Sequence, residues 1–173
     1  MNIRQQLLLE HSKLNTQAIV DYIDDNKTRF GELMDIFLNG NLREVQRASW
    51  VVSVSGKNYP KLVLPYLPDM VNKLKHPQHN AVRRNVVRLF QYMDLPESIL
   101  GEVVDICFTL LNDPQEAIAN RAFSMTVLYN ACLREPLLAD ELKATIEMHM
   151  EEGSAGFKSR GKKILKQLSS LKS

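Results

Sequence analysis

Arginine, aromatic and amide side chains recur at short helical spacings and suit the binding of an anionic partner. The six that stand out are Arg47, Trp50, Arg84, Arg88, Asn120 and Phe123. Within each successive pair the two residues are three or four positions apart, so a helix would present both on one side. Arginine grips carboxylates in a bidentate geometry, and arginine and tryptophan are common anchors of protein interfaces. These residues therefore predict a surface for an acidic or mixed peptide.

The same residues also have a purely structural interpretation. Trp50 and Phe123 would pack between neighbouring helices, and the arginines would only be solvated. For Trp50 we favour packing, because the single tryptophan of a small domain is usually largely buried. For Arg47, Arg84 and Arg88 both interpretations stay open.

The C-terminal segment is basic. From Gly153 onward the chain carries no acidic residue and six cations, which are Lys158, Arg160, Lys162, Lys163, Lys166 and Lys172. Together with Arg83 and Arg121, this segment would bind the phosphates of a nucleic acid. The alternative is a capping helix with a polar outer face, which the acidic segment 140–152 would neutralise.

No set of residues indicates catalysis or metal binding. His76 and His79 are three positions apart, but zinc usually takes three or four protein ligands and no nearby cysteine or carboxylate completes the set. The sequence has no phosphate-binding glycine loop and no nucleophile elbow. We therefore expect a protein that is not an enzyme, with no catalytic residues, no metal and no cofactor.

The composition is that of an ordinary soluble globular protein. The chain has 173 residues, a formal net charge of +2 and 45% apolar residues, which excludes a disordered chain. Its longest uninterrupted apolar run is three residues, far short of a membrane span, and the N-terminus is not a convincing signal peptide. Cys107 and Cys132 lack the C-x-x-C spacing, so we expect them to be reduced and structural in a cytoplasmic protein.

The elements that must position these side chains are repeated helix pairs. Four similar segments open on apolar residues separated by 37, 36 and 39 positions, namely Val45, Val82, Ile118 and Phe157. A small residue follows four positions later in three of them (Ser49, Ala122 and Gly161), where it would let two helices approach closely. Further amphipathic helices are expected over 28–38, 65–74, 97–111 and 138–150. The β-branched stretch 50–55 is expected to be helical as well, because a lone strand cannot satisfy its backbone groups.

This pattern resembles the HEAT-like repeats, the armadillo-type α-solenoids, of the small bacterial type. The motifs that carry the resemblance are a proline turn at Pro77 or Pro114 and the opening Val82–Arg83. The Asp–Arg ladder that is frequent in that family is incomplete. Arg83 follows the opening residue Val82, but Ala119 follows the opening residue Ile118. The resemblance implies an all-α, right-handed solenoid of about four to five antiparallel helix pairs.

The resemblance also implies an organisation and a function. One domain over 1–173 would consist of an N-terminal cap (1–26), repeats at about 28–76, 77–113 and 114–152, and a basic capping helix (153–173). Residues 1–26 would cap this chain or swap onto a neighbour. We expect a protein-binding adaptor or scaffold that uses its concave face, with a nucleic-acid binder as the alternative. The sequence indicates no membrane partner and leaves the oligomeric state open.

Overall fold

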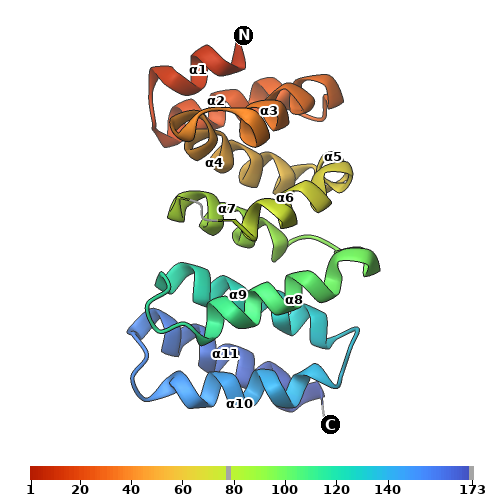
Figure 1. The fold of residues 1–173 in the computed structure, drawn as a ribbon, viewed down its shortest axis with the longest axis vertical. Coiled ribbons are helices and arrows are strands. Elements are labelled where there is room, and N and C mark those ends of the chain that lie inside the picture. Colours follow the sequence, from red (N-terminus) through yellow and green to blue (C-terminus); the bar gives the residue numbers. More distant parts are fainter. Residues whose placement is uncertain (77–78, 172–173) are drawn as a thin grey trace. The chain divides into compact units, whose positions relative to one another are not determined.

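The computed structural model describes residues 1–76 and 79–171, and these residues form helices with no strand (Figure 1). Pro77 and Lys172, used in the sequence argument, lie outside the described residues. The helices are α1 (Ile3–Leu9), α2 (Lys13–Ile23), α3 (Lys27–Asn39), α4 (Leu42–Asn58), α5 (Pro60–Val63), the 3-10 helix η1 (Leu64–Tyr66), α6 (Leu67–Leu74), α7 (Asn80–Phe90), α8 (Glu97–Asn112), α9 (Ile118–Cys132), α10 (Leu138–Met150) and α11 (Ala155–Leu171). The all-α prediction is confirmed, and the stretch 50–55 lies inside α4.

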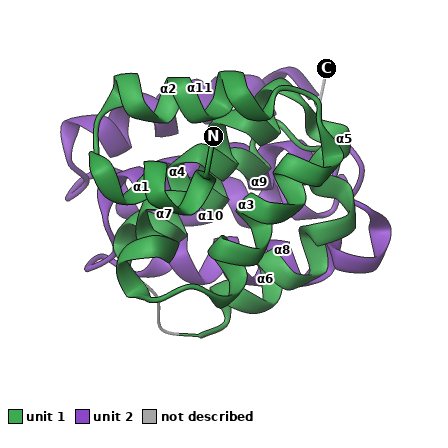
Figure 2. Ribbon diagram, turned by 90° about the horizontal axis from the view of Figure 1, so that it is seen from above, with its two compact units in different colours: residues 1–94 green, residues 95–173 purple. Residues whose placement is uncertain are grey.

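The chain divides into two compact units, Met1–Asp94 and Leu95–Ser173, coloured separately in Figure 2. In the first unit α4 is central, because α1, α2, α3 and α7 all pack against it. In the second unit α9 is central and is packed by α8, α10 and α11. The expected repeat 77–113 contains α7 and α8, which belong to different units, and the expected repeat boundaries stay a prediction. A single domain over 1–173 and a capping role for 1–26 stay predictions.

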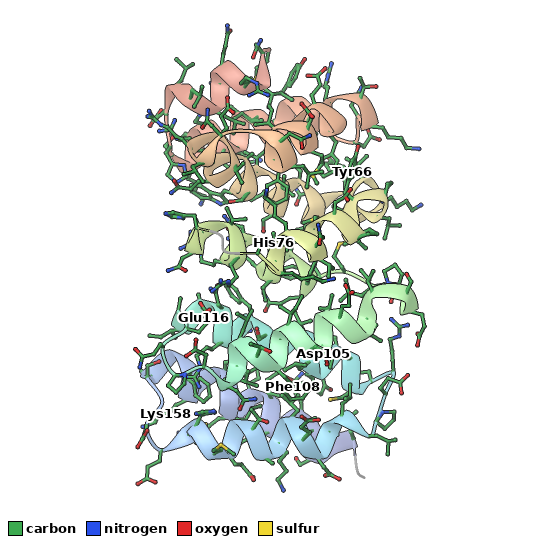
Figure 3. All side chains as sticks on the ribbon, viewed as in Figure 1. Tyr66, His76, Asp105, Phe108, Glu116 and Lys158 are labelled. Atoms are coloured by element: carbon green, nitrogen blue, oxygen red, sulfur yellow. The ribbon has the colours of Figure 1, made fainter. Side chains whose placement is uncertain are left out.

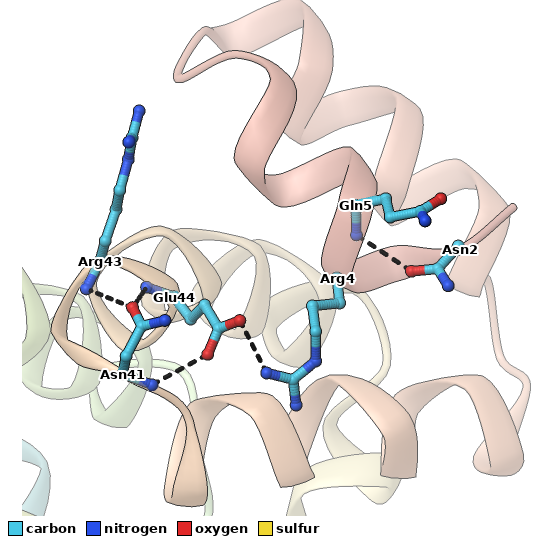
Figure 4. A network of polar contacts seen from close by, with 6 residues as sticks. All are labelled: Asn2, Arg4, Gln5, Asn41, Arg43 and Glu44. Carbon is cyan, nitrogen blue, oxygen red and sulfur yellow. Dashed lines mark hydrogen bonds and ion pairs between the residues drawn. The ribbon is translucent and has the colours of Figure 1, made fainter.

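The start of α4 is fixed by a capping box that also holds α1 (Figure 4). Asn41 Oδ1 accepts hydrogen bonds from the backbone N–H groups of Arg43 and Glu44, and Glu44 Oε2 accepts one from Asn41 N. Arg4 of α1 donates to Glu44 Oε1 at 2.7 Å. The backbone N–H of Asn41 and then Arg4 lower the pKa of the Glu44 carboxyl. The first helix is thereby tied to the central helix of its unit.

Two glycines mark places where helices lie very close together. A Cβ on Gly161 would lie 2.8 Å from Met150 Sδ, which confirms the close approach expected at that position. A Cβ on Gly56 in α4 would lie 2.6 Å from Val63 Cγ2 and 2.9 Å from Leu89 Cδ2. Leu89 and Val63 are both fully buried, so neither can move aside freely.

Gly56→Ala should therefore lower the free energy of unfolding by about 1–2 kcal/mol, because the cost of overpacking exceeds the gain in helix propensity. Gly101 is the matched control, since it lies inside α8 and a methyl group added there would have no atom within 4 Å. Gly101→Ala should raise the free energy of unfolding by about 0.5–1 kcal/mol. Urea denaturation followed by circular dichroism measures both, and equal effects of the two substitutions would contradict the close packing at Gly56.

Candidate functional site

A small pocket opens between α4 and α7 within the first unit. Its volume is about 160 Å³, and it is lined by His11, Gln46, Trp50, Ala81, Arg84, Asn85 and Arg88. Three of the residues expected at a binding surface, Trp50, Arg84 and Arg88, therefore line one pocket. His11, Gln46 and Asn85 were not among the binding residues expected from the sequence.

The two helices present these side chains because their opposite faces are buried. Val82, Val86 and Leu89 bury one side of α7, which leaves Arg84 and Arg88 one turn apart on the other side. On α4, Gln46 and Trp50 are likewise one turn apart. The buried Asn85 side chain donates to Ser49 Oγ at 2.9 Å and so holds the two helices together beside the pocket.

His11 comes from the turn between α1 and α2, and that turn is held in place on both sides. Asn15 Nδ2 donates to the carbonyl oxygens of Gln6 (2.9 Å) and Glu10 (2.7 Å). Arg47 Nη1 donates to the Leu7 carbonyl at 2.7 Å. The His11 ring meets Trp50 edge-on, with 5.5 Å between ring centroids and 69° between planes. The wall of the pocket is thus fixed before any ligand arrives.

The pocket is cationic. Within residues 1–76 and 79–171, the guanidinium groups of Arg84 and Arg88 make no hydrogen bond or ion pair. No carboxylate of the described residues lines the pocket. Partial burial, and then the charges of Arg47 and Arg84, lower the pKa of His11 below its ordinary value. The positive charge at the pocket therefore has no anionic side chain of the described residues beside it, and an anionic ligand would supply one.

Arg84→Gln should raise the pKa of His11 towards its ordinary value of about 6.5, because it removes one of the two cations that oppose protonation. In the unfolded chain His11 has its ordinary pKa, so protonation of His11 destabilises the folded state as the pH falls below that pKa. Over this pH range Arg84→Gln should lose less stability than the wild-type protein. NMR titration of the His11 imidazole measures the pKa directly. Arg43→Gln, which changes an exposed cation outside the pocket, is the control. An unchanged His11 pKa in Arg84→Gln would contradict the geometry.

Three other arginines of the sequence argument are used inside the fold. Arg47 binds the Leu7 carbonyl and Arg121 Nε binds the Leu111 carbonyl at 3.0 Å, so each satisfies an acceptor in the last turn of a helix. Arg121 is only 7% exposed, and its guanidinium lies 4.4 Å from the Phe157 ring centroid. Arg160 donates to Thr126 Oγ1 at 2.6 Å. Arg47, Arg121 and Arg160 are bonded within the fold and do not line the pocket.

The remaining predicted residues do not line the pocket. Asn120 in α9 is fully buried and donates to Glu116 Oε1 at 2.7 Å; Glu116 is labelled in Figure 3. Phe123 is half-buried on α9, and Arg83 is half-buried on α7. Lys158 on α11, also labelled in Figure 3, is half-exposed. The exposed lysines of the same helix are Lys162, Lys163 and Lys166.

Neither the histidine pair nor the cysteines form a chemical site. His79 Nδ1 accepts from the backbone N–H of Ala81 and caps α7. No group of three or more metal-ligating side chains gathers in the described part of the chain. Cys107 and Cys132 are free and buried, and burial raises the pKa of their thiols to about 12 and about 11.

Among the described helices, none is both long and apolar enough to cross a membrane. The cytoplasmic location stays a prediction.

Comparison with known proteins identifies the family. A model described as a HEAT repeat domain matches residues 3–168. Searches of curated proteins and of solved structures gave no match. HEAT repeat domains are commonly protein-interaction scaffolds and are generally not catalytic. The match covers nearly the whole chain, and all regular secondary structure in the described residues is helical. This chain therefore belongs to the HEAT repeat domain family.

Proposed function

We propose that this protein is a non-enzymatic adaptor that binds an acidic segment of a protein partner in the pocket between α4 and α7. The observation that carries the proposal is the pair Arg84 and Arg88, whose guanidinium groups have no partner in the described chain and border a pocket without a carboxylate. Arginines that serve the fold, such as Arg47, are bonded to backbone carbonyls, which makes the unbonded pair distinct.

The pocket combines the two features that anchor a peptide. Arg84 and Arg88 are separated by one helical turn, about 6 Å along α7, so both can reach one anionic side chain or two neighbouring ones. Trp50 offers an apolar surface beside them, and its ring is positioned by His11. Hydrogen bonds from a guanidinium group to an anionic group are charge-assisted, and they are stronger than those between neutral groups.

Selection of random peptides against the full chain tests the proposal. We expect acidic peptides to be enriched on the wild-type protein and on Arg43→Gln, and not on Arg84→Gln/Arg88→Gln. The two charge-removing changes spare the fold, because these side chains make no internal bonds within the described residues. Enrichment of neutral or basic peptides, or equal enrichment on the double variant, would refute an anion-binding pocket.

Nucleic-acid binding is a second proposal, which one observation favours. Lys162, Lys163 and Lys166 are exposed on α11 and have no hydrogen bond or ion pair from their ammonium groups among the described residues. Arg121 and Arg160 donate hydrogen bonds within the fold, so the exposed lysines are the residues that support this proposal. If α11 binds nucleic acid, the affinity should fall steeply as salt is raised. Absent or salt-insensitive binding to a mixed-sequence oligonucleotide would exclude this function.

A further inference from the structure

The charge in the pocket exceeds what a carboxylate supplies. Arg84 and Arg88 contribute two permanent positive charges, and no acidic side chain lines the pocket. A carboxylate brings one negative charge, whereas a phosphorylated serine or threonine brings about −1.5 to −2 at neutral pH. A phosphoryl group therefore matches the formal charge of the two arginines, and it also attracts His11, which is the third group at the site able to carry a positive charge.

The donors that line the pocket come from three parts of the chain. Arg84 and Arg88 come from α7, Gln46 comes from α4, and His11 comes from the turn before α2. The free oxygens of a phosphoryl group point to different sides of the phosphorus, whereas the two oxygens of a carboxylate lie in one plane and point the same way. Donors on separate elements thus suit a phosphoryl group better, and each arginine can still bind it through two N–H groups.

The size of the pocket also selects the kind of ligand. Its volume of about 160 Å³ is well below the roughly 300–1,000 Å³ of pockets that enclose whole small molecules. It is nevertheless several times the roughly 30 Å³ occupied by one water molecule in the liquid. A pocket of this size accepts one side-chain group whose remaining chain stays outside, which is how a protein partner would be held.

We infer that the anion bound in this pocket is the phosphoryl group of a phosphorylated serine or threonine on the protein partner. This inference rests on the proposed adaptor function and specifies its ligand. Arg84 and Arg88 bind the phosphoryl oxygens, and His11 and Gln46 close the site from the other side. The methylene group of the phosphorylated residue lies against Trp50. Phosphorylation of the partner then controls when the adaptor binds.

The single tryptophan of the chain is Trp50, so ligand binding can be followed without a label. The full-length protein is titrated with three degenerate peptide libraries that differ only in the central residue, which is phosphoserine, glutamate or serine. Inorganic phosphate is titrated separately. We expect the phosphoserine library to bind at least about tenfold more tightly than the glutamate library, and the serine library to bind least. Calorimetry on the same samples gives affinities that do not depend on Trp50 fluorescence.

Variants decide whether the pocket is responsible. Arg84→Gln and Arg88→Gln should each reduce the preference for phosphoserine over glutamate by about tenfold or more, while Arg43→Gln keeps it. If the glutamate library binds as tightly as the phosphoserine library, the phosphoryl inference is overturned and the acidic-peptide adaptor stands. If inorganic phosphate binds as tightly as the phosphopeptides, the ligand is a free phosphate compound and the protein partner is overturned. If none of the libraries binds, the proposed function fails together with the inference.

Discussion

Replacing Phe157 with alanine should lower the free energy of unfolding by about 4 kcal/mol. Phe157 is 1% exposed near the start of α11, and its ring has the Arg121 guanidinium on one face and the His149 ring at 6.3 Å. The substitution leaves a cavity and removes the aromatic face beside a buried cation, whose Nη2 already lacks a hydrogen-bond partner among the described residues. For a protein whose total stability is about 5–15 kcal/mol, this is a large loss.

Two probes can localise the effect of Phe157→Ala in a urea titration. Circular dichroism follows all helices, whereas Trp50 fluorescence reports only the first unit. The prediction requires a lower urea midpoint by circular dichroism. If the midpoint measured by fluorescence is unchanged, only the second unit is destabilised. Phe157→Leu is the control and should cost about 1–1.5 kcal/mol, because most of the buried volume remains. A loss below about 1 kcal/mol in Phe157→Ala would contradict the central place of this ring.

A double-mutant cycle separates the ring's packing from its contact with Arg121. We expect Phe157→Ala and Arg121→Ala to be coupled by about 1–2 kcal/mol, since the guanidinium lies 4.4 Å from the ring centroid in a largely desolvated place. Additive effects would show that Arg121 stabilises the unit through the Leu111 carbonyl alone.

The sequence predicted the orientation of α7 because this helix leaves one side exposed. Val82, Val86 and Leu89 recur with helical period and are buried, so the positions opposite to them had to face outward. Arg84 and Arg88 occupy those outward positions, which is why a pattern in the sequence identified two residues of the pocket. The period of apolar residues determines a face only when the helix has one neighbouring layer and one exposed side.

The same argument failed for α9. Ile118 is the apolar residue that opens its segment and is 51% exposed, whereas Asn120 was expected at a binding surface and is 0% exposed. Helices α8, α10 and α11 all pack against α9, so several of its sides are covered. Polar residues such as Ser124 are then buried along with apolar ones, and the periodic contrast that marks a single inner face is lost.

The different uses of the arginines depend on tertiary structure. Arg47 and Arg84 both lie two positions after the apolar residue that opens their segments, so the sequence treats them alike. Arg47 finds the Leu7 carbonyl, which lies in the last turn of α1 and lacks an intrahelical partner. His11 likewise joins the pocket only through the packing of α1 and α2 against α4. No spacing along the chain reveals which carbonyl or which turn will lie beside a given arginine.

Reversing both charges with Arg84→Glu/Arg88→Glu should weaken binding of an acidic peptide by at least about 30-fold, and binding of a phosphopeptide by more. Hydrogen bonds to a charged group contribute about 1.5–3 kcal/mol each, and here the new carboxylates also repel the ligand. The thermal midpoint should change little, because neither guanidinium is bonded within the described chain. Isothermal titration with a peptide selected on the wild-type protein measures the affinity, and a thermal melt measures the stability.

Arg47→Glu should lower stability, so it tests which arginines serve the fold and which serve binding. Its guanidinium caps the Leu7 carbonyl, and a carboxylate in that place would repel the carbonyl oxygen. We therefore expect Arg47→Glu to lower the thermal midpoint, whereas the charge reversal at Arg84 and Arg88 lowers affinity at unchanged stability. If the double variant keeps its affinity, the pocket is not the binding site. If the double variant loses stability as Arg47→Glu does, Arg84 and Arg88 serve the fold. Their lack of internal bonds would then not indicate a binding partner.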